Sequence, residues 1–504
     1  NPGRFPRMNA KTRISCGLLL GAALAACSSA PPKPEAVAHM IQPQRVTDHR
    51  GADDLLTAGL GLDGLRAMAA PAFADPANPT PAELRRRAIW ANWRGIADLS
   101  LTGSYGQAYG SVASAPGREY SALATVPGAK QPHRVLVQVP DNFDATKRCV
   151  VVTASSGSRG VYGAIAVAAP WALPKGCAVA YTDKGAGTDY FDLTDQRGAR
   201  EDGTIGELGV DTLAFTPDAP VGASGVAVKH AHSKDNPEAD WGKHVKQAAE
   251  FALAALDQAF PQAAPFRFDN TRVIAVGISN GGGAVLRASE EEGGWLDAVV
   301  AGEPNIYAAD APGARSLYDY TTEAALLMPC AMLDLPADSL PQPPLRAQVE
   351  PLWTARCATL KAAGLVTGAD AKAQAASAHA QLKANGWTDE ALVAGALSVG
   401  FDLWRAVAVT YASAYGRYGV GEHPCGFAFS AQNADFSARA ATAAERAAWW
   451  SEGSGIPPGA GVGIVDTTLA PPDFTLPGLQ CLRALQTGST DDARRVQAGI
   501  AQTA

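Results

Sequence analysis

The stretch Arg272-Val273-Ile274-Ala275-Val276-Gly277-Ile278-Ser279-Asn280-Gly281-Gly282-Gly283 decides the fold of this chain. After its first residue it begins with an apolar run that is typical of a buried strand. A glycine-rich turn containing one serine follows, and an alanine-containing stretch typical of a helix comes next. Small residues on both sides of Ser279 indicate a tight turn, because larger side chains there would collide with the strand and the helix.

Residues 277–281 read G-x-S-x-G, and the setting makes this short pattern specific. A strand, a glycine-rich turn and a helix in this order form the nucleophile elbow of α/β-hydrolases. Ser279 is therefore predicted to be a nucleophile, and the backbone N–H of Asn280 is predicted to stabilise the oxyanion. A second oxyanion donor is expected from the turn at 155–160, with Gly157 or Ser158 as candidates. The alternative is a chance match in which Ser279 only caps a helix.

The fold class predicted from the whole chain is α/β: an α/β-hydrolase core with a mostly parallel sheet and a large inserted helical cap. Strands alternate with helices before the elbow, which is typical of βαβ units. Strands are expected at 120–126, 133–139, 149–154, 177–182, 272–276 and 298–301, and helices at 80–96, at 240–259 and from about 283. The Ala-rich stretch from about 310 to 450 shows no convincing strand; helices are expected there at 345–363, 369–385, 388–399 and 438–450.

These patterns divide the chain into five segments. Residues 1–27 are upstream residues and a signal peptide, 28–45 a linker, 46–309 the core, 310–475 the helical cap, and 476–504 the start of a return to the core. The C-terminal part of the core is expected to be missing from this chain.

In an α/β-hydrolase, the acid and the histidine of the catalytic triad follow the serine in the chain. The only histidines after Ser279 are His379 and His423, and neither follows a core strand. Asp466 is the best available acid, but no late sheet strand clearly leads into it. We therefore expect the triad Asp and His beyond Ala504, and a fragment without them to be inactive. The first residue, Asn rather than Met, also suggests a fragment.

The N-terminal segment is typical of an export signal. From Met8, two basic residues precede a short apolar run at 14–26, which is too short to span a bilayer. Cys27 ends a sequence like a lipoprotein cleavage box and is the predicted lipidation site; the alternative is an ordinary signal with a coincidental cysteine. We expect an exported protein, extracellular or periplasmic, with an outer-membrane lipoprotein as one form. Six cysteines follow Cys27, an even number that suits three disulfides, with 15 pairings open.

Composition and charge exclude several classes of function. A hydrophobic fraction of 47% argues against disorder, and a net charge of −7 without a long basic run argues against a nucleic-acid partner. His230 and His232 alternate like metal ligands, but no third ligand is evident, so no metal and no cofactor is expected. These two histidines are interpreted as part of a polar loop or of the active-site rim. The sequence leaves the oligomeric state open.

Several separated segments together resemble one family, the bacterial D-(−)-3-hydroxybutyrate oligomer hydrolases, which are exported serine esterases. The segments are TASSGSRGVYGAI at 153–165, CAVAYTDKGAG at 177–187, KHAHS at 229–233, NPE at 236–238, DWG at 240–242, and the elbow with NGGG at 280–283. The resemblance runs from about residue 45 to the end of the chain, and shared spacing across separated segments is more specific than an elbow alone.

The resemblance implies hydrolysis of the ester bonds of 3-hydroxybutyrate dimers and short oligomers, with Ser279 as the nucleophile. Family members are longer and carry the triad Asp and His in a C-terminal core segment, which agrees with the gap after Ser279. The expected partner is a small oligoester, and a lipid on Cys27 would anchor the protein to a membrane. A more distant likeness is to tannases and feruloyl esterases. The alternatives are therefore an esterase of that type, a broader polyester hydrolase, or a non-catalytic surface lipoprotein with a hydrolase fold.

Overall fold

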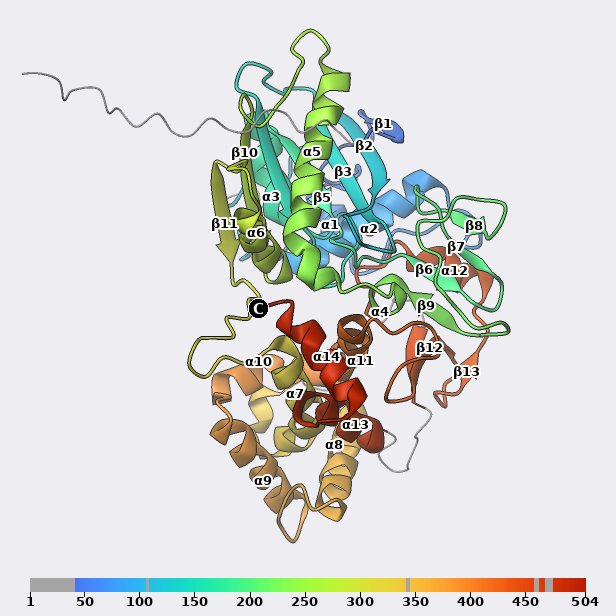
Figure 1. The fold of residues 1–504 in the computed structure, drawn as a ribbon, viewed down its shortest axis with the longest axis vertical. Helices are drawn as coiled ribbons and strands as arrows, with labels where there is room; N and C mark the ends of the chain where they lie inside the picture. The colour runs from blue at the N-terminus through green and yellow to red at the C-terminus, as the bar shows by residue number, and fades with distance from the viewer. Residues whose placement is uncertain (1–40, 106–107, 341–344, 457–461, 467–474) are drawn as a thin grey trace, which may run out of the picture.

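The computed structural model describes residues 41–105, 108–340, 345–456, 462–466 and 475–504. An α/β part forms one end of the molecule and a helical part the other, with two small sheets at their side (Figure 1). The predicted signal segment and Cys27 lie outside the described residues.

A seven-stranded mixed sheet forms the centre of the α/β part. Its order is β1 (Arg45–His49), β2 (Gly117–Ala124), β3 (His133–Pro140), β5 (Ala178–Thr182), β4 (Cys149–Ala154), β10 (Arg272–Ile278) and β11 (Ala298–Gly302). Pairs from β5 to β11 are parallel, whereas pairs from β1 to β5 are antiparallel. The expected sheet was mostly parallel; the connection between β2 and β3 is too short for a crossover helix, and this produces an antiparallel pair.

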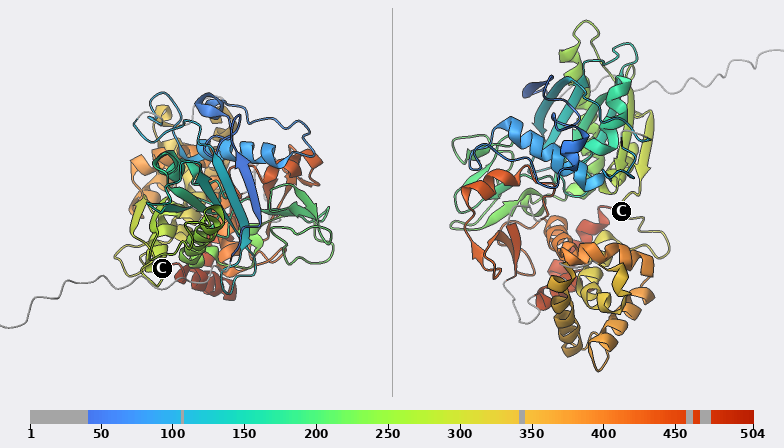
Figure 2. Two further views of the ribbon diagram at one scale, coloured as in Figure 1. Left: turned by 90° about the horizontal axis from the view of Figure 1, so that it is seen from above. Right: turned by 180° about the vertical axis from the view of Figure 1, so that it is seen from behind.

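Helices cover both faces of this sheet because successive strand residues point to opposite sides. Val150 and Val152 of β4 pack in one apolar cluster with residues of α5 (Trp241–Ala259) and α6 (Asn280–Glu290). Val151 packs in the other cluster with residues of α2 (Pro81–Ile96) and α3 (Ile165–Ala172). Figure 2 shows α2, in blue, on the face opposite to α5.

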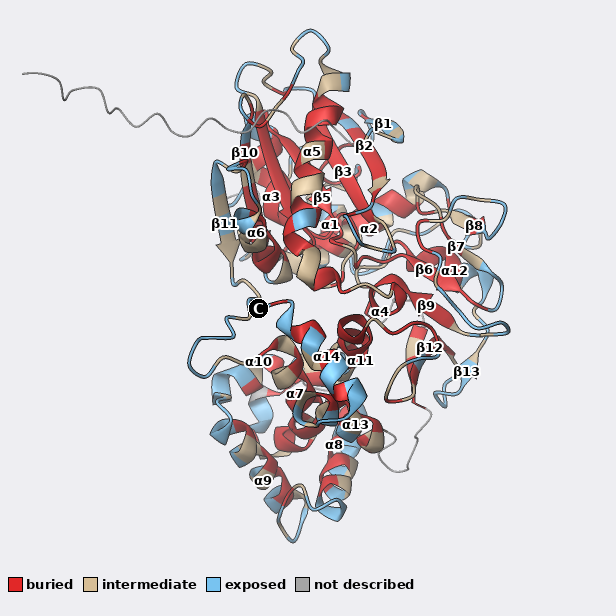
Figure 3. Ribbon diagram, in the orientation of Figure 1, coloured by how far each residue is buried: buried red, intermediate tan, exposed pale blue. Residues whose placement is uncertain are grey.

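The central strands are buried, and the last strand is not. All residues of β3, β4 and β5 are buried, whereas Val300 of β11 is exposed (Figure 3).

The helix predicted from residue 80 begins with a capping box, in which the side chains of Thr80 and Glu83 each accept a hydrogen bond from the other residue's backbone N–H.

Two small sheets lie beside the junction of the two parts (Figure 1). One contains β8 (Ile205–Glu207), β7 (Arg197–Ala199), β6 (Tyr190–Asp192) and β9 (Val226–Val228). The other contains β13 (Ala438–Arg439), β12 (Phe427–Gln432) and β14 (Val462–Asp466). The prediction of an all-helical stretch up to residue 450 is therefore wrong at β12 and β13. Both strands are short, β13 has only two residues, and the longest pairing of β12 is with the distant β14, so local periodicity gave little signal.

The helical part contains the helices predicted at 345–363, 369–385 and 388–399, together with described helices at 317–331, 403–416, 476–487 and 491–501 that lie outside the predicted ranges. Its helices are α7 (Leu317–Ala331), α8 (Leu345–Ala362), α9 (Ala371–Ala384), α10 (Asp389–Gly400), α11 (Leu403–Gly416), α13 (Leu476–Thr487) and α14 (Asp491–Ala501). The helix expected at 438–450 is shorter, because α12 is Ala443–Trp449. No single helix of the described chain is long and apolar enough to cross a bilayer. Among the described helices, only α10 and α11 taken together are long and apolar enough to cross a bilayer, and they meet at a bend of 81°.

Three disulfides use the six cysteines that follow the signal segment. Cys149 pairs with Cys177, Cys330 with Cys357, and Cys425 with Cys481. The first joins the beginnings of two neighbouring strands, and the second joins α7 to α8.

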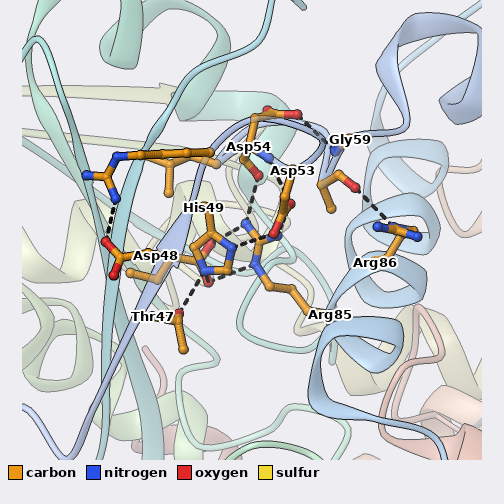
Figure 4. A network of polar contacts seen from close by, with 12 residues as sticks. Thr47, Asp48, His49, Asp53, Asp54, Gly59, Arg85 and Arg86 are labelled. Atoms are coloured by element: carbon orange, nitrogen blue, oxygen red, sulfur yellow. Dashed lines mark hydrogen bonds and ion pairs between the residues drawn. The ribbon is translucent and has the colours of Figure 1, made fainter.

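A buried charge network lies between β1, β2 and α2 (Figure 4). Arg85 donates two hydrogen bonds to the Glu119 carboxylate, both at 2.9 Å, and one to Asp53 at 3.0 Å. His49 Nδ1 lies 2.8 Å from the Asp53 carboxylate. The positive charge of Arg85 holds the pKa of the buried Glu119 carboxyl at about 2. These four residues are called the Arg85 cluster below.

Candidate active site

Ser279 lies at the turn between β10 and α6, where the sequence predicted an elbow. Its backbone angles, φ 56° and ψ −122°, are rare for a residue with a side chain, and such strain concentrates at functional sites. The flanking glycines are needed for close approach. A Cβ on Gly277 would lie 2.2 Å from the Gly281 carbonyl oxygen, and one on Gly281 would lie 2.5 Å from that of Ala154.

The backbone of Ser279 is fixed on both sides while its side chain is exposed. Its N–H donates to the Gly302 carbonyl at 3.0 Å, and its carbonyl accepts from the amides of Gly283 and Asn305 at 3.0 and 2.9 Å. Ser279 is exposed to solvent. The turn is therefore rigid, and the hydroxyl is accessible at the carboxyl end of the parallel strands, as a nucleophile requires.

The side chain of Asn280 connects the elbow to two other segments. Its Oδ1 accepts a hydrogen bond from the Gly157 amide at 3.0 Å, and the side chain also hydrogen-bonds the hydroxyl of Tyr411 in α11. The expected turn at 155–160 is thus adjacent to the elbow. Of its two candidate donors, the Gly157 N–H is engaged by Asn280.

Ser158, the other candidate, contacts one of the two predicted rim histidines. Its Oγ lies 2.6 Å from Nδ1 of His230, whose ring meets Tyr411 edge-on at 4.7 Å between centroids. His230 is buried, and burial lowers its pKa to about 3, so the imidazole is neutral at physiological pH.

The interpretation of His230 and His232 as part of a polar loop is wrong. Both lie in the short helix α4 (Lys229–His232), and all four of its residues are buried. Lys229 is paired inside the protein with Asp183 and Asp189, at 2.7 and 2.8 Å, which lets this polar sequence enter the core. His232 accepts from the Val228 amide at 3.1 Å. In the part of the chain that the structure describes, no group of three or more His, Cys, Asp or Glu could hold a metal ion.

The other candidate triad residues lie elsewhere. His379 is held between the carboxylates of Asp334 and Asp389, both at 2.8 Å, and His423 donates to the Val409 carbonyl at 3.0 Å. Asp466 ends β14, in a small sheet rather than the central one. Among the described residues, no side chain is hydrogen-bonded to the Ser279 hydroxyl.

Sequence reasoning missed two buried groups near Asn280 and the 155–160 turn. Glu238 accepts a 2.6 Å hydrogen bond from Tyr415 of α11, and burial raises the pKa of its carboxyl to about 7. Lys184 follows β5 and donates to the Gly157 carbonyl at 2.6 Å. Both residues lie inside segments that carried the family resemblance, but only their tertiary contacts indicate a role.

An exposed serine on a strained strand-to-helix turn, at the edge of a mixed sheet covered by helices, defines an α/β-hydrolase-like protein. The 3HB-oligomer hydrolase (3HBOH) family matches residues 22–504, and the chain belongs to this family.

Individual relatives agree with this assignment. The chain is 41% identical to a D-(−)-3-hydroxybutyrate oligomer hydrolase of Burkholderia vietnamiensis, over 90% of this chain and 73% of that protein. It is 40% identical to one of Polaromonas naphthalenivorans, over 91% and 73% of the two chains.

Two solved esterase structures match at a distance. The rice cell wall degrading esterase LipA of Xanthomonas oryzae matches with 12% identity and a TM-score of 0.24, over 48% of this chain and 60% of that chain. Feruloyl esterase B of Aspergillus oryzae matches with 12% identity and a TM-score of 0.21, over 49% and 37%. At such TM-scores these likenesses carry no argument.

Proposed function

We propose that this protein is a serine esterase that hydrolyses the ester bonds of 3-hydroxybutyrate dimers and short oligomers. The family assignment supports the substrate class. The observation that carries the mechanism is the exposed Ser279 hydroxyl on a turn whose backbone is strained and hydrogen-bonded on both sides.

The reaction proceeds by two acyl transfers. The Ser279 oxygen attacks the ester carbonyl carbon and passes its proton to a general base, and the carbonyl oxygen becomes an oxyanion. The backbone N–H of Asn280 and a second amide of the 155–160 turn stabilise that charge. The tetrahedral intermediate expels the alkoxide of the leaving 3-hydroxy acid, which takes the proton from the base. Water then attacks the acyl-enzyme by the same route and releases the second acid. No described histidine is assigned as the base, because none contacts Ser279.

The helical part is proposed to act as a cap over this site. The hydrogen bond from Asn280 to Tyr411 and that from Tyr415 to Glu238 both join α11 to the α/β part close to the elbow. A cap held there would exclude water around the oligoester and supply apolar contacts to its methyl groups.

The protein produced from its complete gene should release 3-hydroxybutyrate from the linear dimer, and Ser279→Ala should abolish that release. A fluorophosphonate probe should label wild-type protein at Ser279. Release of ferulate or gallate at a higher kcat/KM would instead favour a feruloyl- or tannase-type esterase. An unlabelled, inactive wild-type protein would favour a non-catalytic binding role.

We also propose export with lipidation of Cys27. The apolar segment before Cys27 supports this, and three disulfides suit an oxidising compartment. Cells supplied with labelled palmitate should incorporate label into the wild-type protein and none into Cys27→Ser. Equal labelling of both proteins, or none in the wild type, would contradict lipidation.

A further inference from the structure

The peptide between Gly157 and Ser158 is held from one side by a buried lysine. Lys184 Nζ donates to the Gly157 carbonyl oxygen at 2.6 Å and to Ser155 Oγ at 3.2 Å. Lys184 is 1% exposed and adopts a left-handed backbone conformation, φ 48°. A strained, buried cation pointing at a backbone carbonyl next to the elbow is an unusual use of a lysine.

Because a peptide is planar, the contact of Lys184 with the Gly157 carbonyl also fixes the direction of the Ser158 N–H. In a trans peptide the C=O of one residue and the N–H of the next point in opposite directions. Because Lys184 fixes the Gly157 carbonyl, it also fixes the Ser158 N–H, which points away from the ammonium group.

The Ser158 N–H is a buried donor without an acceptor among the described residues. The hydroxyl of Ser158 contacts His230, its carbonyl accepts from the Gly455 amide at 2.8 Å, and the residue is 4% exposed. Buried N–H groups are nearly always paired, so an orphaned one indicates a ligand atom. The neighbouring Gly157 N–H is already used by Asn280.

The charge on Lys184 is not neutralised by a direct ion pair. Asp183 and Glu238 act on it only at longer range, and its Nζ lies 5.3 Å from the centre of the Trp241 ring. Within the described chain, no carboxylate lies within ion-pair distance of Lys184. A cation bonded to a carbonyl oxygen polarises the whole peptide, and this makes the N–H on its other end a stronger donor.

We propose that Lys184 is a positioning residue of the oxyanion hole: it orients and polarises the Gly157–Ser158 peptide, so that the Ser158 amide is the second donor to the oxyanion formed at Ser279. Asn280 completes the arrangement, because its side chain holds the preceding amide of the same turn while its own N–H is the first donor. The inference rests on the proposed esterase function and adds the identity of the second donor and of the group that aims it.

Three variants of the complete protein test this. Lys184→Met removes the donor and the charge, and kcat for the linear dimer should fall by about 10- to 100-fold, somewhat less than the loss of an oxyanion donor itself, with KM within about threefold. Lys184→Arg keeps a charged donor and should recover part of the loss. Lys147→Met makes the same change at an exposed lysine that is ion-paired with Asp144 at 3.2 Å, and as the matched control it should stay within about threefold of wild type.

Binding of a trifluoromethyl ketone separates positioning from general damage. This inhibitor forms an oxyanion on the serine, so its Ki should rise in Lys184→Met by the same factor by which kcat/KM falls. A loss of activity with unchanged Ki would overturn the proposal. So would wild-type kcat in a folded Lys184→Met protein.

Asn280→Ala provides a second route should Lys184→Met not fold. It releases the Gly157 amide, keeps its own backbone N–H, and should lower kcat and raise Ki in parallel by about 10-fold. Unchanged values would overturn the inference. An inactive wild type, or full activity in Ser279→Ala, would overturn the proposed function and this inference together. An active wild type with an inactive Ser279→Ala and an unaffected Lys184→Met would overturn the inference alone.

Discussion

The Arg85 cluster and the surroundings of Lys184 are both buried and charged, but their charges are balanced differently. Arg85 has carboxylates at 2.9 and 3.0 Å, and its pKa is raised above its usual value mainly by Glu119 against the cost of burial. Among the described residues, the Lys184 ammonium group has only a carbonyl and a hydroxyl as hydrogen-bond acceptors, and burial lowers its pKa to about 7. Lys229, which directly follows β9, resembles Arg85 because two aspartates pair with it.

This difference separates a structural charge from a functional one. Once two opposite charges are buried together, removing either leaves the other unpaired, so such a pair is essential for stability. An ammonium group buried without a paired carboxylate costs folding free energy, and its charge acts on the neighbouring peptide. Strongly shifted pKa values without a pairing partner are accordingly typical of active sites.

The largest expected effect lies at the elbow itself. Ser279→Ala should lower kcat by about 10⁴-fold or more, because the acyl-enzyme cannot form. Its thermal unfolding midpoint should stay close to that of wild type, since the exposed hydroxyl has no hydrogen-bond partner among the described residues. Residual esterase activity near the wild-type level would contradict the mechanism; a coupled assay for 3-hydroxybutyrate and a thermal melt decide both points.

Arg85→Met should give the opposite result. It leaves Glu119 and Asp53 as uncompensated carboxylates, and the free energy of unfolding should fall by about 3–5 kcal/mol. The kcat of the remaining folded protein should be unchanged. Urea unfolding and active-site titration with the fluorophosphonate measure the two quantities. A fall in kcat per titrated site would show that the Arg85 cluster also serves the reaction.

Through His230 and through Asp53 of the Arg85 cluster, acid should lower the free energy of unfolding in different pH ranges. The pKa of His230 is about 3 when folded and ordinarily 6.5, so the unfolded chain takes up a proton first, and stability falls as pH drops from 6.5 towards 3. Asp53 has a folded pKa of about 2 against 3.8, so its contribution is present above pH 3.8 and is lost only as pH falls towards 2. His230→Gln should reduce the slope of unfolding free energy by up to about 1.4 kcal/mol per pH unit between pH 4 and 6. Asp53→Asn should leave that slope unchanged between pH 5 and 6, and equal effects of both variants in that range would contradict the separation.

The smallest expected effect comes from the hydroxyl of Tyr162, which contacts the Arg85 cluster. Tyr162 donates to the Glu119 carboxylate at 2.7 Å, so Tyr162→Phe should lower the free energy of unfolding by about 1.5–3 kcal/mol, at or below the cost of Arg85→Met. Activity should be unaffected. A matched Tyr320→Phe variant, at a tyrosine that donates no hydrogen bond to this cluster, serves as the control in the same urea titration.

Sequence reasoning predicted the elbow because its strand, glycines and helix are contiguous, and predicted most long helices from local periodicity. It could not predict that Tyr411 hydrogen-bonds Asn280, since 130 residues separate them and nothing local marks the contact. It interpreted the KHAHS segment as a polar loop, because the aspartates that pair with Lys229 lie in another loop. In the sequence, Lys184 is one residue of a predicted turn, and nothing marks it as functional. Its hydrogen-bond partner is a backbone carbonyl, which no side-chain motif can indicate.

The Cys149–Cys177 disulfide joins β4 and β5 just before their first paired residues, Val150 and Ala178. The two strands end at Ala154 and Thr182, and the peptide at Gly157 and the Lys184 side chain follow within three residues. A covalent bond at one end of a strand pair therefore sets the alignment of two groups at the other end. A two-residue shift in strand register would displace one strand by about 7 Å, and the disulfide prevents such a shift. Protein made where this disulfide cannot form would lack the covalent restraint that keeps a carbonyl and an ammonium group in register.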